Sequence, residues 1–191
     1  MRKGDQTRGR MIDTAARLLQ AQGYHGTGLG QVLAEARAPK GSLYFHFPGG
    51  KEELAAEALR RSAESWREAV LAVVHAAPSP LDAIRAVCEL LATHLEASEF
   101  RDGCPIATVA LEAAPTSQPL HEACAEAYRT WEGVIEERLR GEGMPAARAE
   151  RIATLVLAAI EGALVLSKAA RSATPLRKVG TELPALLRTL V

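Results

Sequence analysis

Apolar residues recur at helical spacing along most of the chain. Near the N-terminus two such faces follow each other, and their members are Ile12, Ala15, Ala16 and Leu19, then Leu29, Val32, Leu33 and Ala36. This spacing predicts two short amphipathic helices. Gly23, with the apolar Tyr24 behind it, matches a left-handed cap for the first helix. Thr27 stands where the second helix needs an N-cap.

A short polar and aromatic segment follows these two faces. The sequence Arg37-Ala38-Pro39 interrupts the second helix, and Pro39 favours the start of a third. Residues 40–47 combine aromatic rings, basic groups and small polar residues, and Pro-Gly-Gly at 48–50 ends the run. A buried core does not need that mixture, whereas a surface that binds nucleic acid does. Helix, tight turn and short helix is the helix-turn-helix layout, whose second helix enters the major groove.

The rest of the chain continues the helical pattern. We expect a long helix after Gly50 and further helices over residues 81–98, 104–112, 120–140, 147–170 and from 175 onward. Pro184 lies inside the last of these and is expected to kink or split it. The prediction is an all-α protein of about nine helices. A three-helix head over residues 1–50 is joined by the long helix to a helical body over residues 51–191.

Charge is distributed unevenly along a chain whose net charge is zero. Residues 1–51 carry eight Lys and Arg against three Asp and Glu, a net of +5, and residues 52–191 carry the balancing −5. A basic end and an acidic remainder suggest that the head meets a polyanion. Charge alone would not decide this, since small fluctuations are common. It matters because it coincides with the helix-turn-helix pattern.

Composition excludes several other classes of protein. The 191 residues are 48% hydrophobic and only 4% aromatic, rich in alanine and leucine, which suits a helical core. Three cysteines without a C-x-x-C pair, no signal peptide and no uninterrupted run of about 18 apolar residues favour a cytoplasmic protein outside the membrane. The histidines and cysteines lack metal-ligand spacing, so we expect no metal and no cofactor. A nucleophile elbow, a Gly-rich phosphate loop and paired catalytic acids are also missing, which argues against an enzyme.

Together these residues resemble the TetR family of bacterial transcriptional regulators. The resemblance runs from about Thr7 to Leu54 and rests on Ala15-Ala16-Arg17-Leu18-Leu19, Gly23-Tyr24, Thr27, Gly41-Ser42-Leu43-Tyr44, His46-Phe47 and Lys51-Glu52-Glu53-Leu54. The body resembles the LmrA/YxaF-like branch at residues 47–51, 103–106, 161–163 and 175–176. One departure is Arg37, where the family commonly has glycine, a residue that suits a positive φ. Arginine either accepts strain there or the turn avoids that conformation, and it adds a cation beside DNA.

The resemblance implies a homodimer in which each head reads one half of a palindromic operator in double-stranded DNA. It also implies a cavity in the body for a small inducer. Members often repress efflux or resistance genes, and some in this branch respond to flavonoid-like or drug-like aromatic molecules. Repression and activation are both compatible with the sequence. A protein-interaction adaptor with a non-functional head is the alternative, and an intact set of DNA-contact residues argues against it.

The DNA-contact residues follow from the same segment. Leu43 and Phe47 lie four apart and are expected to hold the recognition helix to the head. Tyr44 and His46 lie off that face. Their phenol and imidazole groups can donate to phosphate oxygens, as their family counterparts usually do. Phe45 either meets a thymine methyl group or folds back on the head, and Lys51 starts the long helix, where free N–H groups also favour a phosphate. The predicted DNA-binding set is Thr27, Arg37, Lys40, Gly41, Ser42, Tyr44, Phe45, His46 and Lys51.

The body supplies the predicted ligand and dimer residues. Small apolar side chains and a few large rings suit a largely apolar inducer. The expected ligand-binding set is Trp66, Cys88, Leu91, Leu95, Cys104, Ala107, Tyr128, Trp131 and Ile135. The alternative is that these rings and thiols simply fill the core, with a redox role for Cys88 or Cys104 as a minor interpretation. The last two helices are suited to a four-helix dimer interface through Leu155, Val156, Ile160, Leu164, Leu183, Leu186 and Leu187.

Overall fold

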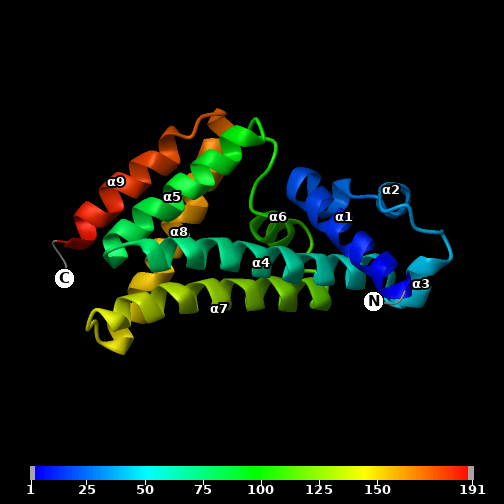
Figure 1. Ribbon diagram of the computed structural model, residues 1–191, viewed down its shortest axis with the longest axis horizontal. Coiled ribbons are helices and arrows are strands. Elements are labelled where there is room, and N and C mark those ends of the chain that lie inside the picture. The colour runs from blue at the N-terminus through cyan, green and yellow to red at the C-terminus, as the bar shows by residue number, and fades with distance from the viewer. Residues whose placement is uncertain (1–2, 189–191) are drawn as a thin grey trace. The chain divides into compact units, whose positions relative to one another are not determined.

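The computed structural model describes residues 3–188, which form nine α-helices and no strands. Their bounds, in the order labelled in Figure 1, are α1 (Lys3–Gly26), α2 (Leu29–Glu35), α3 (Ser42–His46), α4 (Gly50–Ala76), α5 (Pro80–Ala97), α6 (Pro105–Glu112), α7 (Gln118–Gly141), α8 (Ala146–Ala170) and α9 (Thr174–Arg188). The predicted all-α fold is confirmed, and the helix boundaries lie close to those expected from apolar spacing and from Pro and Gly punctuation.

The chain divides into two compact units. The first contains Met1–Ser65 and Cys104–Ala127, and the second contains Trp66–Gly103 and Tyr128–Val191. The first unit therefore includes α6 and the first part of α4 and α7 in addition to the helix-turn-helix segment. These two units are defined by contacts between residues. The boundary at residue 50 instead separates a DNA-binding head from a ligand-binding body, and it stays a prediction.

The core of the first unit is built from the apolar faces seen in the sequence. Met11, Leu19, Val32, Leu54 and Leu59 are almost completely buried. α1 packs against both α2 and α6. Exposed ion pairs join the outer sides of these helices. Each such surface pair contributes at most about 1 kcal/mol. Burial of the apolar face therefore supplies most of the stability of this unit.

Two helix ends in this unit differ from the sequence prediction. Gly23 has the expected positive φ of 73°, but its ψ of −175° is far from the left-handed helical region, and α1 resumes as far as Gly26. Thr27 does not cap α2, since Gly28 occupies the N-cap position. The Thr27 hydroxyl instead donates to the Gly23 carbonyl oxygen at 2.6 Å. The kink at Gly23 leaves its carbonyl oxygen without a helical partner. The Thr27 hydroxyl therefore bonds to this carbonyl and does not cap α2.

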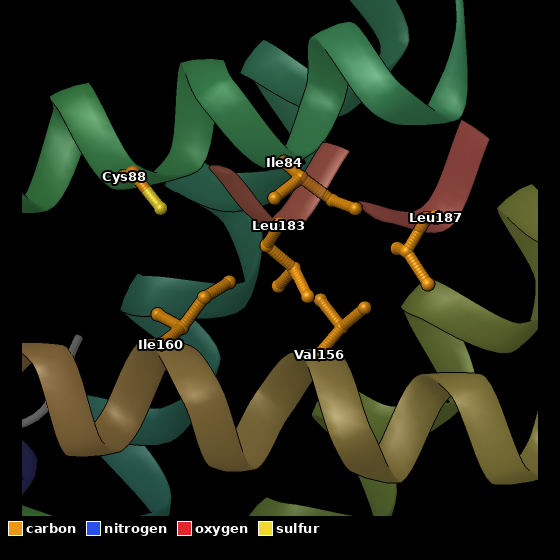
Figure 2. Packing of buried hydrophobic residues seen from close by; sticks show 6 residues of the cluster. All are labelled: Ile84, Cys88, Val156, Ile160, Leu183 and Leu187. Carbon is orange, nitrogen blue, oxygen red and sulfur yellow. The ribbon is translucent and has the colours of Figure 1, made fainter. Parts of the chain in front are cut away.

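The core of the second unit lies between α5, α8 and α9 (Figure 2). Its buried members are Ile84, Cys88, Val156, Ile160, Leu183 and Leu187. Leu183 of α9 points toward Val156 and Ile160 of α8. Gly180 lets α9 approach α5 closely, because a Cβ there would lie 2.9 Å from the Cβ of Cys88. The glycine in α9 is therefore required by packing, although it lowers the helix propensity of the segment.

Polar contacts fix the same three helices. Arg177 of α9 donates to both carboxylate oxygens of Glu89 and of Glu96 on α5, with the shortest distances at 2.9 and 2.7 Å. The hydrogen bonds from Arg177 lower the pKa of Glu96 below its ordinary value. The buried Ser167 hydroxyl of α8 accepts from the Leu176 N–H at 3.2 Å and holds the first turn of α9.

α9 is continuous through Pro184, so the predicted split of this helix does not occur. Pro184 is buried, as are Leu183 and Leu187. Tertiary packing therefore holds the helix past a residue that has no backbone N–H to donate. The chain turns after α5 at Glu99 and Phe100, with φ values of 52° and 60°, and the Phe100 N–H donates to the Leu95 carbonyl.

α8 has two apolar faces. Its inner face includes Val156, Ile160 and Leu164, all buried, whereas Leu155 and Leu166 are 49% and 61% exposed. Among the described residues α8 is the one helix long and apolar enough to cross a membrane, by length and composition only. The sequence count of uninterrupted apolar residues missed it because Glu161 falls inside the window. A buried inner face is typical of a core helix.

Candidate nucleic-acid interface

The turn between α2 and α3 is held by backbone geometry. Arg37 has φ 50°, so this arginine does adopt the positive φ that glycine would favour. The Arg37 N–H donates to the Ala34 carbonyl, and the Ala38 N–H donates to the Leu33 carbonyl at 2.9 Å, which closes α2. Arginine in this conformation costs roughly 1 kcal/mol relative to glycine. Arg37 therefore accepts backbone strain, and its side chain is exposed.

α3 starts later than the sequence predicted. Pro39 does not begin the helix, and its carbonyl oxygen accepts from both the N–H and the hydroxyl of Ser42, at 2.9 and 2.6 Å. Gly41 is the N-cap residue and is exposed, with open space where a side chain would be. The Ser42 hydroxyl is thus used to form the turn, and Gly41 leaves the backbone accessible.

The short α3 presents two opposite faces. Leu43 and Phe47 are buried, as predicted, and the Arg8 guanidinium lies 5.1 Å above the Phe47 ring. On the other side Tyr44 is 64% exposed and Phe45 is 81% exposed. The Phe45 ring meets the His46 imidazole edge to face at 4.9 Å. Phe45 therefore does not fold back onto the head, and its contact with a thymine methyl group stays a prediction.

The basic residues of the head differ in whether they are paired. Arg8 pairs with Glu57 at 2.9 Å, Arg17 pairs with Glu35, and the Arg10 Nε donates to the Ala36 carbonyl at 3.0 Å. Arg37 and Lys40 are exposed, and neither has a carboxylate partner among residues 3–188. Arg37 and Lys40 on the turn before α3 are therefore basic residues of the head that stay available to bind an anion.

Lys51 is placed differently from the prediction. Its ammonium donates to the Tyr24 carbonyl oxygen at 2.7 Å and lies 4.2 Å from the centre of the Tyr24 ring. Partial burial lowers the pKa of Lys51, opposed by the nearby Glu112 carboxylate. The N-terminus of α4 is also occupied, since Glu53 accepts from the Gly49 N–H at 2.7 Å. Lys51 and the start of α4 therefore stabilise the first unit in this structure and do not present a free phosphate site.

We expect Lys51→Met to destabilise the first unit and to leave the salt dependence of DNA affinity unchanged. Methionine keeps an apolar stem but removes the hydrogen bond to Tyr24 and the contact with its ring, which together contribute about 2 kcal/mol. Urea unfolding followed by circular dichroism measures the loss. A shallower salt dependence of DNA affinity with unchanged stability would instead show that Lys51 neutralises a phosphate.

The Thr27 side chain is also not accessible to DNA in this structure. It is 4% exposed, and its hydroxyl already donates to Gly23. The geometry argues against direct contact between the Thr27 side chain and a phosphate. The predicted DNA-contact residues that remain accessible are Arg37, Lys40, Gly41, Tyr44, Phe45 and His46.

Glu112 and Arg10 support the head in ways that sequence reasoning missed. The Glu112 carboxylate, at the end of α6, accepts the Tyr24 N–H at 2.7 Å and the His25 N–H at 3.2 Å. The His25 imidazole Nε2 lies 3.2 Å from the Glu112 carbonyl oxygen. Arg10 closes the end of α2 through Ala36. The sequence around Glu112 contains no local pattern that predicts a contact with residues about ninety positions earlier.

The predicted ligand-binding residues are divided between the two units, with Cys104 and Ala107 in the first and the others in the second. Cys88 is 1% exposed in the core shared with α8 and α9, and Leu91 and Ile135 pack against that core. Leu95 is fully buried, and Cys104 sits at the N-cap of α6, where its sulfur accepts the Ala107 N–H at 3.4 Å. Burial raises the pKa of the Cys88 thiol to about 11, with a further contribution from Glu89, so its thiolate is scarce at neutral pH. The Cys88, Leu91 and Ile135 side chains belong to helix packing.

The aromatic members of that set keep partial exposure. Trp66 meets the His94 ring edge to face at 4.8 Å, and the His94 imidazole lies 3.5 Å from an Asp102 carboxylate oxygen. Tyr128 and Trp131 form a second edge-to-face pair at 5.8 Å. No group of three His, Cys, Asp or Glu side chains within residues 3–188 could hold a metal ion. The second unit thus offers half-buried aromatic rings.

The predicted dimer residues fall into two groups. Val156, Ile160, Leu164, Leu183 and Leu187 are at most 8% exposed and belong to the core of the second unit. Leu155 is 49% exposed and Leu186 is 62% exposed. Apolar spacing could not separate these groups, because α8 is apolar on both sides.

Comparison with known proteins now decides the family. Residues 11–58 match the model of the bacterial regulatory proteins, tetR family, and residues 80–182 match that of the transcriptional regulator LmrA/YxaF-like, C-terminal domain. The chain belongs to the TetR family. The chain is similar to the HTH-type transcriptional regulator LmrA of Bacillus subtilis (strain 168), with 43% identity over 98% of this chain and 100% of that protein. It is 36% identical to YxaF of the same organism, over 97% of each chain.

Solved structures agree with this TetR-family fold. A TetR transcriptional regulator from Chloroflexus aurantiacus J-10-FL has a TM-score of 0.81 and 31% identity, and covers 98% of this chain and 97% of its own. A TetR-family regulator from Cytophaga hutchinsonii has a TM-score of 0.83 at 24% identity, over 99% and 96% of the two chains, which shows the shared fold. The protein is therefore a TetR-family, DNA-binding transcriptional regulator and not an enzyme, and the accessible face of α3 is its candidate DNA interface.

Proposed function

We propose that this TetR-family regulator is a cytoplasmic homodimeric repressor that binds a palindromic operator through α3 and leaves it when a small, largely apolar inducer binds the body. The observation that carries the DNA contact is the arrangement around α3. Arg37 and Lys40 have no carboxylate partner in the described part of the chain, and they precede a helix whose outer face is Tyr44, Phe45 and His46. Cations and hydroxyl or imidazole donors suit phosphates, and a short helix suits the major groove.

The outer face of α8 supports a dimer. Its exposed small and apolar residues recur every three or four positions, and they are Leu155, Ala158, Gly162, Val165, Leu166 and Ala169. Gly162 has open space where a Cβ would lie, so a second helix can approach closely there. An apolar stripe of this length on a helix is unfavourable in water, and a second copy of α8 would cover it.

Half-buried rings in the second unit support an apolar, aromatic inducer. Trp66, Tyr128 and Trp131 provide flat walls, and the His94 and Asp102 pair provides a polar group beside Trp66. Binding sites for small molecules are mostly apolar with a few polar groups that set orientation. The inducer must bind better to a conformation that does not fit the operator, because only differential affinity shifts a population.

Two elements could carry the response to the head. α4 runs without a break from Gly50 to Ala76, so it connects the end of α3 with Trp66 through one helix. α6 ends in Glu112, whose carboxylate holds two N–H groups at the end of α1. A shift of either helix would change the position of the head elements it contacts.

Salt dependence of DNA binding tests the proposed interface. We expect Arg37→Asn and Lys40→Gln each to lower affinity and to reduce the slope of log K against log salt by about 0.9, because each removes one phosphate contact. Asparagine tolerates the positive φ at position 37, so the turn is kept. Fluorescence anisotropy with duplexes selected from a randomised library gives the slopes.

Arg61→Gln is the matched control for this experiment. It removes the same charge from the same unit, but Arg61 pairs with Asp13 at 3.1 Å away from α3, so its slope should equal that of the wild type. Equal slopes for all three variants would place the DNA contact elsewhere. An absence of salt-sensitive DNA binding would instead favour a protein-interaction adaptor.

A further inference from the structure

Phe45 occupies the centre of the outer face of α3. Leu43 and Phe47 are buried and mark the inner side of the helix. At about 100° per residue, Phe45 projects opposite to the middle of that inner side, with Tyr44 and His46 on either flank. Its 81% exposure agrees with this placement. The residue most directly opposed to the head core is therefore an apolar ring.

Such a ring cannot read most features of DNA. Phenylalanine neither donates nor accepts hydrogen bonds, so the donors and acceptors on base edges give it nothing to recognise. The thymine C5 methyl is the one apolar group that an ordinary base pair displays in the major groove. The surroundings of Phe45 favour DNA over an apolar protein surface, because Arg37 and Lys40 precede it and polar Tyr44 and His46 flank it.

We propose that Phe45 is a specificity-determining residue that packs against a thymine C5 methyl group in each operator half-site. The inference rests on the proposed binding of DNA through α3. It adds that recognition at this position depends on the methyl group alone, so 5-methylcytosine should be accepted better than cytosine there. Tyr44 and His46, by contrast, would contact phosphates and would fix orientation without reading sequence.

The test uses full-length protein and the best duplex recovered from a randomised DNA library. Each deoxythymidine of the duplex is replaced in turn by deoxyuridine, which removes only the methyl group. We expect one position per half-site to weaken binding about 4-fold, the effect of withdrawing roughly one buried methyl group. At that position the uracil penalty should disappear in Phe45→Ala and persist in Phe45→Leu. Placing 5-methyl-deoxycytidine there should give tighter binding than deoxycytidine.

Tyr44→Phe is the matched control, since it removes a hydroxyl next to Phe45. It should lower affinity for the thymine and uracil duplexes by the same factor. A uracil penalty that is the same in Phe45→Ala and in the wild type, or that is absent at every position, would overturn the proposal. Failure of the wild-type protein to select any duplex would overturn DNA binding through α3 itself, so the two failures are distinguishable.

Discussion

Ile160→Glu is expected to unfold the second unit. Ile160 is 7% exposed and packs with Val156 and Leu183 in the core between α5, α8 and α9. The substitution removes a buried aliphatic side chain and places a carboxylate among apolar neighbours, which together should lower the free energy of unfolding by about 4 kcal/mol or more. Trp66 and Trp131 both lie in the second unit, so urea unfolding followed by tryptophan fluorescence measures the loss.

The pH dependence of this variant gives a second readout. Burial raises the pKa of a carboxyl group above its value in the unfolded chain. Stability is then greatest at low pH, where the group is neutral, and falls as pH rises from about 5 to 8. Ile160→Val is the control and should lose only about 1 kcal/mol without added pH dependence. A well-folded monomeric Ile160→Glu protein would show that Ile160 lies on the dimer surface after all.

Leu155→Glu combined with Leu166→Glu is expected to give a folded monomer. The two positions are eleven residues apart, so they lie on the same side of α8, and both side chains are about half exposed or more. Carboxylates there stay hydrated in the monomer but would be buried against a second copy. Operator affinity should fall about 100-fold or more, because a monomer engages only one half-site at a time.

Sedimentation velocity gives the oligomeric state, and circular dichroism verifies that the helices are intact. Leu111→Glu is the matched control, because Leu111 is 83% exposed on α6, a helix of the first unit. It should leave both oligomeric state and operator affinity unchanged. An intact dimer in the double variant would move the interface to another surface.

The recognition helix shows how far local sequence determined the site. Leu43 and Phe47 were identified as inward residues from their spacing alone, and both are buried. A five-residue helix closed by a Pro-Gly-Gly sequence has few alternative ways to pack. Lys51 and Thr27 both bond inward in this structure, for a shared reason. Each can bond either outward to a phosphate or inward to a carbonyl, and both carbonyls became available at the kink around Gly23.

The helices themselves, their order and the family were determined by the sequence, because apolar periodicity and Pro or Gly punctuation act over a few residues. Only the tertiary structure decided which apolar face of α8 is internal, since both faces carry the same kind of residue. It also decided that α9 continues through Pro184 and that Gly180 gives α9 close access to Cys88. The same holds for Glu112, which meets Tyr24 across 88 positions of sequence. Contacts between residues so far apart follow from how helices pack, and no local pattern encodes them.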